Sequence, residues 1–376
     1  MAFFKTQFNA FGLDISDKKI KIVQIDKNFR GTCLKAWGAR DIEPEIVTGG
    51  EIQNPEKLAA HIKSLIKETR GKITTDFAVC VLPENKSFIK LFRVDLREDK
   101  KNTDQDIVEE VKKQLPNYIP IEEKDLRFDS QIISKTNKSA RVLVGAVSKN
   151  IANQYTETLL LAGLKPLALE IEAQSISRSI FSYPSITKPL KQMLKKKKER
   201  IAPSISSKAP VIIIDLGANR SSLIFWHNHV VQFTSSLEIS GNKLTEKISK
   251  DLNITWEKAE KAKKICGLDD KKAKGSVATT IKDMSSVIVS EIKKASDYYQ
   301  KNTGQNVEGL EVFLTGGGSH LPDLPEFITQ KSGIPTKQSN SFTNINRQKI
   351  KMPADQKHLF TSAIGLALRH VVIEDL

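Results

Sequence analysis

Two aspartates, each near the end of a short apolar run and just before a tight turn, are the residues best suited to chemistry. Asp14 lies in the run Phe-Gly-Leu-Asp-Ile, and Asp215 lies in the run Val-Ile-Ile-Ile-Asp-Leu. Magnesium in proteins is held by carboxylate oxygens, commonly with waters between them. A nucleoside triphosphate also needs backbone N–H groups and small residues beside its phosphates. The two turns therefore predict a magnesium–nucleotide site with one carboxylate from each half of the chain.

Small, hydroxylic or basic residues surround both turns, as a phosphate site requires. The candidate binding residues are Ser16, Lys18 and Lys21 on the first turn, Gly217, Ala218, Ser221 and Ser222 on the second, and Gly316, Gly317 and Gly318 further on. The three glycines follow an apolar strand and offer adenosine a surface without side chains. A strand aspartate alone is more often a cap or a turn former, and a glycine turn is more often a plain loop. The three features in this order are more specific than any one of them.

The elements that must position these residues follow from the apolar periodicity. Strands are predicted as a hairpin within 11–24 and at 32–40, 76–82, 88–94, 125–133, 141–147, 167–171, 211–216, 221–226, 230–235 and 312–314. Helices are predicted at 54–68, 103–114, 151–161, 173–181, 243–252, 255–265, 277–301, 323–331 and 360–369. A strand with an acidic residue, a turn and a returning strand therefore occurs twice, and each copy opens one half of the chain.

The length of 376 residues predicts more than one domain. We expect a first lobe that is interrupted by a small α/β subdomain and completed by the last helix, and a second lobe with a helical part. The predicted boundaries are 1–86, 87–165 (the inserted subdomain) and 166–186 for the first lobe, 187–209 for a basic flexible linker, 210–240, 241–309 (helical) and 310–345 for the second lobe, and 346–376 for the closing helix of the first lobe.

The order of the motifs resembles the actin, Hsp70 and FtsA superfamily, whose α/β fold is two-lobed and ribonuclease H-like, with two phosphate loops and an adenosine loop. More closely, the chain resembles the PilM family of type IV pilus assembly. The segments that carry this resemblance are 12–15 with Lys21, 162–166, 215–218, 238–246, 314–318 with 321–322, and 363–369. The resemblance covers nearly the whole chain.

The resemblance implies ATP and magnesium as ligands and gives individual residues a role. Asp14 and Asp215 would hold magnesium through water, and Lys21 would reach the phosphates. Glu172 would orient the attacking water. Gly241 would begin a helix near the nucleotide, and Lys250 would reach the ribose or base.

The first loop departs from the pattern of the superfamily, which usually reads Asp-x-Gly followed by small hydroxylic residues. Ser16 replaces the glycine, and Asp17, Lys18 and Lys19 replace the small residues. A Cβ at position 16 narrows the approach to the phosphates, and a carboxylate at Asp17 would repel them if it pointed inward, although Lys18 would compensate. The second loop has Ala218 where actin carries an acidic residue. Because hydrolysis needs a water held in line, we expect nucleotide binding with slow or absent turnover.

The composition restricts the class of protein. No run approaches the roughly 20 apolar residues that span a bilayer, and the N-terminus has no secretory signal, so we expect a cytoplasmic protein. Cys33, Cys80 and Cys266 are far apart and predict reduced, mostly buried thiols without zinc. There is no Walker-type phosphate loop and no nucleophile elbow.

The net charge is +15, and although the lysines are spread widely along the chain, one run between Lys188 and Arg200 is dense. This segment is predicted to be a solvated linker, and weak attraction to anionic lipid headgroups is the alternative. We expect no nucleic-acid partner, because no zinc finger or RNA-recognition signature is present.

Resemblance to the PilM family implies a cytoplasmic scaffold on the inner membrane that binds the N-terminal tail of a PilN-like bitopic protein in a groove near residues 87–165. It also implies contact with other pilus assembly proteins and motor ATPases, a ring or filament of copies, and a role in pilus, secretion or competence systems. The alternatives are an FtsA-like division adaptor, which the chain end at Leu376 disfavours, a nucleotide-independent adaptor with an inactive cleft, and a sugar or acetate kinase, for which no catalytic carboxylate or substrate insertion is seen.

Overall fold

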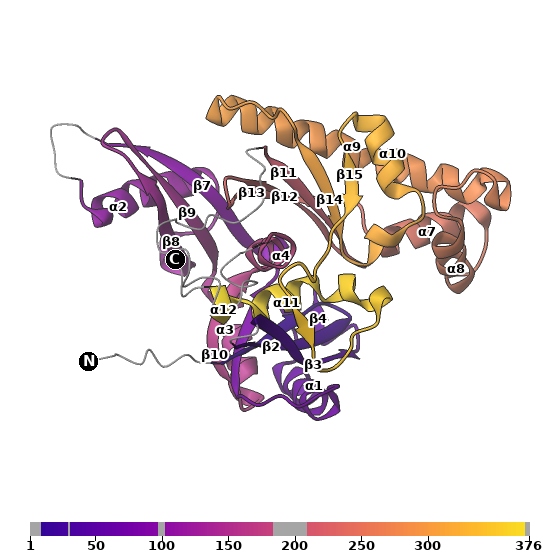
Figure 1. The fold of residues 1–376 in the computed structure, drawn as a ribbon, viewed down its shortest axis with the longest axis horizontal. Helices are drawn as coiled ribbons and strands as arrows, with labels where there is room; N and C mark the ends of the chain where they lie inside the picture. Colours follow the sequence, from indigo (N-terminus) through magenta and orange to yellow (C-terminus); the bar gives the residue numbers. More distant parts are fainter. Residues whose placement is uncertain (1–8, 29–30, 97–101, 183–208, 373–376) are drawn as a thin grey trace. The chain divides into compact units, whose positions relative to one another are not determined.

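The computed structural model describes residues 9–28, 31–96, 102–182 and 209–372, which form two compact units (Figure 1). The first unit combines Met1–Ile205 with Ser341–Leu376, and the second is Ser206–Asn340. The predicted basic linker lies, except for its last residue, outside the described residues. The finer predicted boundaries within each unit stay a prediction.

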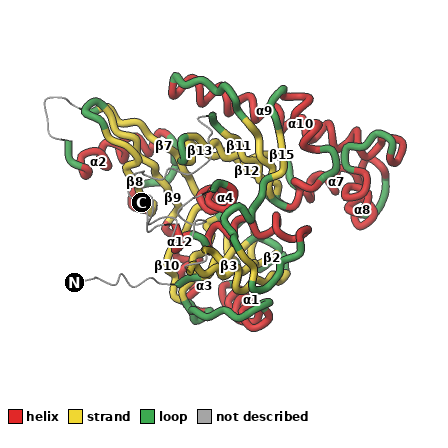
Figure 2. Tube along the Cα trace, in the orientation of Figure 1, coloured by secondary structure: helices red, strands yellow, loops and turns green. Residues whose placement is uncertain are grey.

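The first unit contains a six-stranded sheet in the order β10-β6-β1-β2-β3-β16. Figure 2 draws strands in yellow and helices in red. The strands of this sheet are β1 (Phe11–Ile15), β2 (Lys19–Asn28), β3 (Gly31–Asp41), β6 (Phe77–Leu82), β10 (Lys165–Ile171) and β16 (Arg347–Gln348), with a separate hairpin of β4 (Val47–Thr48) and β5 (Glu51–Ile52). Strand β6 reads as an unbroken apolar run because helices cover both faces of the sheet.

The helices of the first unit divide between the two faces of this sheet. They are α1 (Pro55–Glu68), α3 (Lys149–Leu161), α4 (Glu172–Ile180), α11 (Thr361–Ala367) and α12 (Arg369–Val372). Leu13 and Ile22 pack with α1 and α3 on one face, whereas Val23 and Ile25 pack with α11 on the other. This alternation follows from the period of two along a strand. Gly12 faces α11 and leaves no room for a side chain, because a Cβ there would lie 2.2 Å from the carbonyl oxygen of Ala363.

A smaller layered unit lies within the region predicted as an inserted subdomain. Strands β7 (Ser87–Asp95), β9 (Ser139–Ser148) and β8 (Leu126–Lys135) pair antiparallel, with β9 between the other two. Helix α2 (Asp104–Gln114) covers one face, with Ile107 and Val111 in the shared core. Thr103 and Asp106 form a capping box that fixes where α2 begins.

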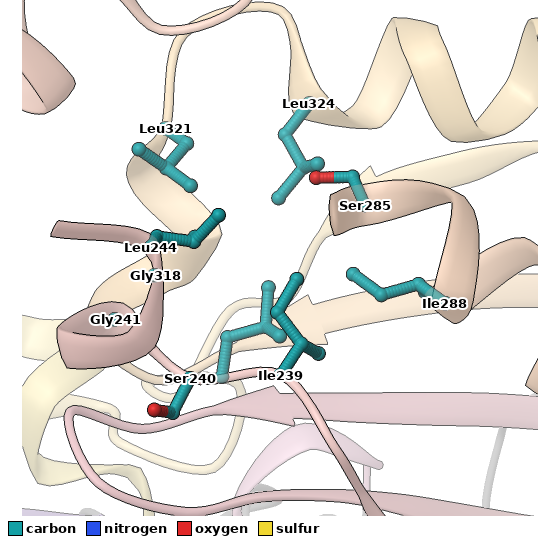
Figure 3. Close-up of a pocket in the computed structure, with 10 residues that line it drawn as sticks. Ile239, Ser240, Gly241, Leu244, Ser285, Ile288, Gly318, Leu321 and Leu324 are labelled. Carbon is teal, nitrogen blue, oxygen red and sulfur yellow. The ribbon is translucent and has the colours of Figure 1, made fainter. Parts of the chain in front are cut away.

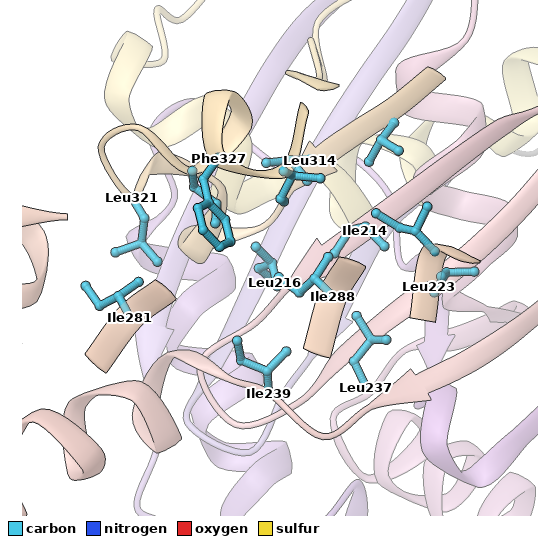
Figure 4. Packing of buried hydrophobic residues seen from close by; sticks show 14 of the residues in the cluster. Ile214, Leu216, Leu223, Leu237, Ile239, Ile281, Ile288, Leu314, Leu321 and Phe327 are labelled. Carbon is cyan, nitrogen blue, oxygen red and sulfur yellow. The ribbon is translucent and has the colours of Figure 1, made fainter. Parts of the chain in front are cut away.

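The second unit is built on five neighbouring strands in the order β15-β14-β11-β12-β13. The strands are β11 (Val211–Leu216), β12 (Ser221–His227), β13 (Val230–Leu237), β14 (Glu311–Thr315) and β15 (Thr336–Gln338), and the helices are α7 (Gly241–Leu252), α8 (Trp256–Cys266), α9 (Ser276–Thr303) and α10 (Leu324–Ser332). Ile288 of α9 lies beside Leu216 of β11, and Phe327 of α10 lies beside Leu314 of β14 (Figure 4). These helices therefore cover one face of the sheet.

The predicted strands and helices are confirmed as elements, and the differences are local. The short strands β4, β5, β15 and β16 were not predicted, because two or three residues carry no measurable periodicity. The single helix predicted at 360–369 is wrong in extent. Phe360 ends a 3₁₀ turn, and the helix breaks at Leu368, whose ψ of −13° departs from the α-helical value. Within the described ranges, no helix is both long enough and apolar enough to cross a bilayer.

Candidate functional site

The first turn places an ion pair at the end of the hairpin β1–β2. Asp14 and Lys21 are opposite each other in the antiparallel register, and the Nζ of Lys21 donates to Oδ2 of Asp14 at 2.7 Å. The side chains are only 6% and 16% exposed, respectively, so the two charges compensate each other away from bulk water. Burial, together with the nearby charge of Asp14, raises the pKa of the Cys80 thiol, which keeps this cysteine protonated.

Side chains shape the rest of the first turn. The N–H and the hydroxyl of Ser16 both reach the carbonyl oxygen of Lys19, at 3.0 and 2.9 Å. Oδ1 of Asp17 accepts the N–H of Gly50 at 3.0 Å, so this carboxylate is directed to the β4–β5 turn. Lys18 is exposed and its carbonyl accepts the N–H of Ile42. The negative charge that the sequence introduces at position 17 is therefore fixed by the fold to a backbone donor.

Glu172 lies at the same edge of the sheet as Asp14. Strands β1, β6 and β10 run parallel, with β6 in the middle, and Glu172 directly follows β10. The ends of β1 and β10 are therefore about 10 Å apart, twice the strand spacing. The Oε1 atom of Glu172 accepts the hydroxyl of Ser362 at 3.0 Å, which ties this carboxylate to α11.

The second turn is built against glycines rather than charges. Asp215 is opposite Ser222 in the hairpin β11–β12 and beside Thr315 in the parallel pair β11–β14. Gly316, the next residue, has φ of +76°, and a Cβ there would lie 2.6 Å from Oδ1 of Asp215. A Cβ at Gly318 would lie 2.8 Å from the Cβ of Leu216. The fold therefore brings the second aspartate and the glycine run together, on a surface that only glycine fits.

The backbone of the second turn is bonded to the start of α7. A Cβ at Gly217 would lie 2.3 Å from the carbonyl oxygen of Arg220, so the turn is tight. The carbonyl of Gly217 accepts the N–H of Gly241 at 2.9 Å, and the carbonyl of Ala218 accepts the N–H of Asn242 at 2.8 Å. The predicted residue Gly241 thus lies beside the second turn.

Two buried serines follow this turn, and one of them is unsatisfied. Ser221 and Ser222 are both buried, and the hydroxyl of Ser221 has no hydrogen-bond partner among the described residues. A buried hydroxyl without a partner costs about 1–3 kcal/mol. A bound oxygen, such as one from a phosphate or its water, would remove this cost, so the residues present fit a phosphate group.

An apolar hollow lies between the start of α7 and the glycine turn (Figure 3). Gly241 and Gly318 both line it, together with Ile288 and Leu321. The hydroxyl of Ser285 also lines it, is buried and has no partner in the described part of the chain. The predicted glycine residues of α7 and of the 3₁₀ turn Gly317–His320 therefore share one region of the second unit.

Lys250 is the predicted residue that the structure does not bring to this region. It lies nine residues after Gly241 on α7, a distance of about 13 Å along a helix. Its Nζ donates to Glu246 at 2.6 Å on the exposed face. Among the residues that are described, no group of three or more His, Cys, Asp or Glu side chains is placed to hold a metal ion.

Three side chains beside Gly241 were missed by sequence reasoning. Lys263 of α8 contacts Gly241, Thr245 and Glu260, and its side chain is 8% exposed. Burial alone would raise the pKa of Glu260, but hydrogen bonds from Lys263, Thr245 and Lys264 outweigh it and lower this pKa to about 2. The only signal in the sequence was the spacing of Glu260 and Lys263, three residues apart on one helical face.

A known protein family and several solved structures match this chain over nearly its whole length. The family described as "Type IV pilus assembly protein PilM" matches residues 12–371. A solved "PilM-PilN type IV pilus biogenesis complex" contains a chain that is 21% identical, with a TM-score of 0.75, over 97% of this chain and 99% of that one.

Two further solved structures have the same fold at lower similarity. The ethanolamine utilization protein EutJ from Carboxydothermus hydrogenoformans is 13% identical, with a TM-score of 0.53, over 96% of this chain and 89% of that one. MreB 5 of Spiroplasma citri, bound to AMPPNP, is 13% identical, with a TM-score of 0.51, over 97% of this chain and 96% of that one. The α/β fold is therefore that of the actin-like ATPases, as predicted.

Proposed function

The chain belongs to the PilM family of type IV pilus assembly proteins, and from this premise we propose that it is an actin-like scaffold that binds Mg-ATP and the N-terminal tail of a PilN-like inner-membrane protein. Nucleotide would act as a conformational ligand that changes the affinity for the partner. The protein would associate with the inner membrane through that partner. The family match favours pilus assembly over the cell-division alternative.

One observation carries the nucleotide proposal. In the second unit, Asp215, the tight turn at Gly217 and the glycine at position 316 meet at the carboxyl ends of two parallel strands. Ligands of open α/β sheets bind at the carboxyl ends of the strands. The unsatisfied hydroxyl of Ser221 on the same turn supports a phosphate there. MreB 5, which has this fold, was solved with AMPPNP.

Each group of the nucleotide has candidate residues. In the second unit, Asp215 would hold magnesium through water, Ser221, Ser222, Gly217 and Ala218 would meet the phosphates, and Gly316, Gly317, Gly318 and Gly241 would border the adenosine. In the first unit, the candidate residues for the metal and the phosphates are Asp14, Ser16, Lys18 and Lys21. Bound magnesium would supply neutralisation of phosphate charge.

Efficient hydrolysis is not part of the proposal. The carboxylate of Glu172 accepts the hydroxyl of Ser362, so one of its oxygens is already engaged. Orientation of an attacking water requires a free acceptor in line with the phosphate. The departures of the first turn from the superfamily pattern point the same way. We therefore propose binding with slow turnover, in which occupancy rather than hydrolysis matters.

A patch on the first unit suits the partner tail. Leu160, Leu161 and Leu167 are 56%, 46% and 39% exposed, and they lie at the end of α3 and on β10. Strand β10 is at the edge of its sheet, and no described strand pairs with its outer side. An exposed edge beside apolar side chains can take an extended peptide as an added strand. This patch, which we call the leucine patch, overlaps the region predicted for the groove.

Calorimetry with Mg-ATP tests the nucleotide proposal. We expect binding heat for the wild type and its loss in Asp215→Ala, because the metal-holding carboxylate is removed. Asp297→Ala, which removes an exposed aspartate on α9 of the same unit, is the control and should bind as the wild type does. Absence of heat from the wild type would sink the nucleotide proposal.

Peptide binding tests the partner proposal. Synthetic N-terminal tails of PilN-like proteins should bind the wild type, and Leu161→Asp should weaken binding at least about tenfold by placing a charge in an apolar contact. Leu359→Asp changes a similarly exposed leucine of the same unit and should have no effect. Equal binding by both variants would remove the leucine patch from consideration.

A nucleotide-independent adaptor is the second candidate, and one observation favours it. The carboxylate of Asp14 is already neutralised by Lys21 at 2.7 Å, so it is less available to the waters of a metal. An adaptor would bind the tail peptide with the same affinity with and without Mg-ATP, whereas the scaffold that we propose would show a change.

A further inference from the structure

Helix α8 and the turn that follows it carry an excess of positive charge on the surface of the second unit. Residues 256–275 contain seven lysines and four acidic residues. Four of these lysines are exposed and form no ion pair with any described residue: Lys258, Lys261, Lys271 and Lys274. Because the fold does not compensate these four charges, they are available to an anionic partner outside the molecule.

The acidic residues of this segment do not cancel that charge. Glu260 and Asp270 pair with lysines of the same unit, and Oδ1 of Asp269 accepts the N–H of Lys271 at 2.9 Å. Glu257 is exposed at the start of α8 and offsets one of the four unpaired lysines. The surface therefore stays positive.

The turn after α8 holds its lysines outside the core in a costly backbone conformation. Ala273, Lys274 and Gly275 have φ of +48°, +53° and +78°. A left-handed conformation costs about 1–2 kcal/mol for a residue with a Cβ, and such strain collects at functional sites. No residue of the 3₁₀ turn Lys272–Gly275 is buried, so packing of the second unit does not account for it.

Two apolar side chains lie among these lysines. Trp256 and Ile265 of α8 are 43% and 53% exposed. Lys261 precedes Ile265 by one helical turn, and the Nζ of Lys272 donates to the carbonyl of Ile265 at 3.0 Å, so lysines lie on both sides of it. Exposed tryptophan and aliphatic side chains combined with lysines are typical of helices that lie in the headgroup layer of a bilayer.

The type of basic residue distinguishes a bilayer from other anionic partners. Residues 221–346 contain no arginine. Base edges and phosphorylated or acidic motifs are recognised mainly by the planar fork of arginine. Lysine is a compact point charge on a flexible stem, which suits the spread charge of anionic lipid headgroups.

We propose that Trp256, Ile265 and the four unpaired lysines, together called the α8 surface, contact the anionic headgroups of a lipid bilayer. This contact is additional to membrane association through the partner tail. It depends on neither the tail nor nucleotide, so it can fail or hold independently of the proposed function.

Flotation of the full chain with vesicles tests the proposal. The wild type should float with vesicles of phosphatidylcholine and phosphatidylglycerol in equal parts, and not with phosphatidylcholine alone. Binding should weaken as salt is raised, because salt screens exposed charges. Equal flotation with both kinds of vesicle would contradict an electrostatic contact.

Two variants remove the same amount of charge from the second unit. The surface variant is Lys258→Gln/Lys261→Gln/Lys271→Gln/Lys274→Gln. The control variant replaces exposed lysines that already pair with acidic residues: Lys247→Gln/Lys250→Gln/Lys294→Gln/Lys337→Gln. The surface variant should bind anionic vesicles at least about a hundredfold more weakly, since each lysine near the headgroups contributes about fivefold. It should melt as the wild type does, because its substitutions are exposed. An equal loss in the control would show that only net charge matters and would overturn the proposal, as would wild-type binding by the surface variant.

Tryptophan fluorescence locates the contact. Trp37 and Trp226 are buried, so Trp256 is the exposed one of the three tryptophans. Anionic vesicles with brominated acyl chains should quench the emission of the wild type, and Trp256→Phe should abolish the quenching. Absence of quenching in the wild type would exclude contact of α8 with the bilayer. Polyglutamate and duplex DNA serve as soluble probes. If the surface variant loses affinity for either probe but not for vesicles, the partner is a protein or a nucleic acid and the proposal is wrong.

Discussion

The two strand–turn–strand hairpins carry an aspartate at the same place but surround it differently. Asp14 faces a lysine across its hairpin and is bonded to it, whereas Asp215 faces Ser222 and lies against Gly316. The first turn is shaped by side chains, and the second is shaped by the absence of side chains. A buried ion pair depends on both charges, and a glycine surface depends on volume. The first hairpin should therefore be sensitive to substitutions that change charge, and the second to substitutions that add side-chain volume.

The largest effect should come from breaking the first hairpin's ion pair. Lys21→Met leaves Asp14 buried without its cation and should lower the free energy of unfolding by about 3–5 kcal/mol. Ser222→Ala, at the matching position of the second hairpin, should cost no more than about 1 kcal/mol. Urea unfolding gives the sizes, and hydrogen exchange within 11–28 reports the first unit separately. Asp14→Asn combined with Lys21→Met should recover most of the loss, and equal costs at the two hairpins would contradict the comparison.

Adding volume to the second hairpin should have the next largest effect. Gly316→Ala places a methyl group 2.6 Å from Oδ1 of Asp215 at a φ of +76°, so we expect at least a tenfold loss of Mg-ATP affinity. Gly163→Ala is the matched control, because Gly163 has φ of +78° and no atom within 4 Å of a built Cβ. Both variants should lose about 1–2 kcal/mol of stability from backbone strain, and Gly316→Ala should lose more, because its Cβ would also lie 2.7 Å from the carbonyl oxygen of Leu216. Only Gly316→Ala should lose affinity for Mg-ATP. An equal loss of affinity in both variants would show that the glycine surface has no specific role in nucleotide binding.

Glu260 of α8, in the same unit as the second hairpin, should make a smaller contribution to stability, and this contribution should depend on pH. The pKa of Glu260 is lowered from 4.5 to about 2, so its charge stabilises the fold at neutral pH. A depressed carboxylate pKa gives stability that is present above the unfolded pKa and is lost as pH falls through the folded one. The wild type should therefore exceed Glu260→Gln in stability at pH 7, with the gap closing between about pH 5 and pH 2. Urea midpoints across this range measure the gap, and a gap independent of pH would exclude the ionised state as its cause.

The local features of this molecule could be predicted from its sequence, and the tertiary ones could not. The strand–turn–strand units and the glycine run follow from apolar periodicity and turn chemistry. The burial of Lys263 could not be inferred, because α8 carries several lysines and only packing against α7 selects one of them. For the same reason Lys250 was placed on the right helix, although its position on the exposed face removes it from the glycine surface. The direction of Asp17 depends on Gly50, a residue far along the chain.

The smallest effect should come from Asp17, and it tests whether charge in the first turn is already balanced. Its Oδ1 accepts the N–H of Gly50 at 3.0 Å, and an asparagine oxygen can accept the same bond. Asp17→Asn should therefore change Mg-ATP affinity by less than about threefold, since a charge directed away from the phosphates is screened by water. If the carboxylate instead faced the phosphates, its removal would raise the affinity about tenfold or more. Asp17→Ala, which loses the bond to Gly50 as well, should accelerate amide exchange at Gly50 while Asp17→Asn does not. Because Asp17→Asn removes only the charge and Asp17→Ala removes the charge and the bond to Gly50, this pair of variants separates the effect of the hydrogen bond from the effect of the carboxylate charge.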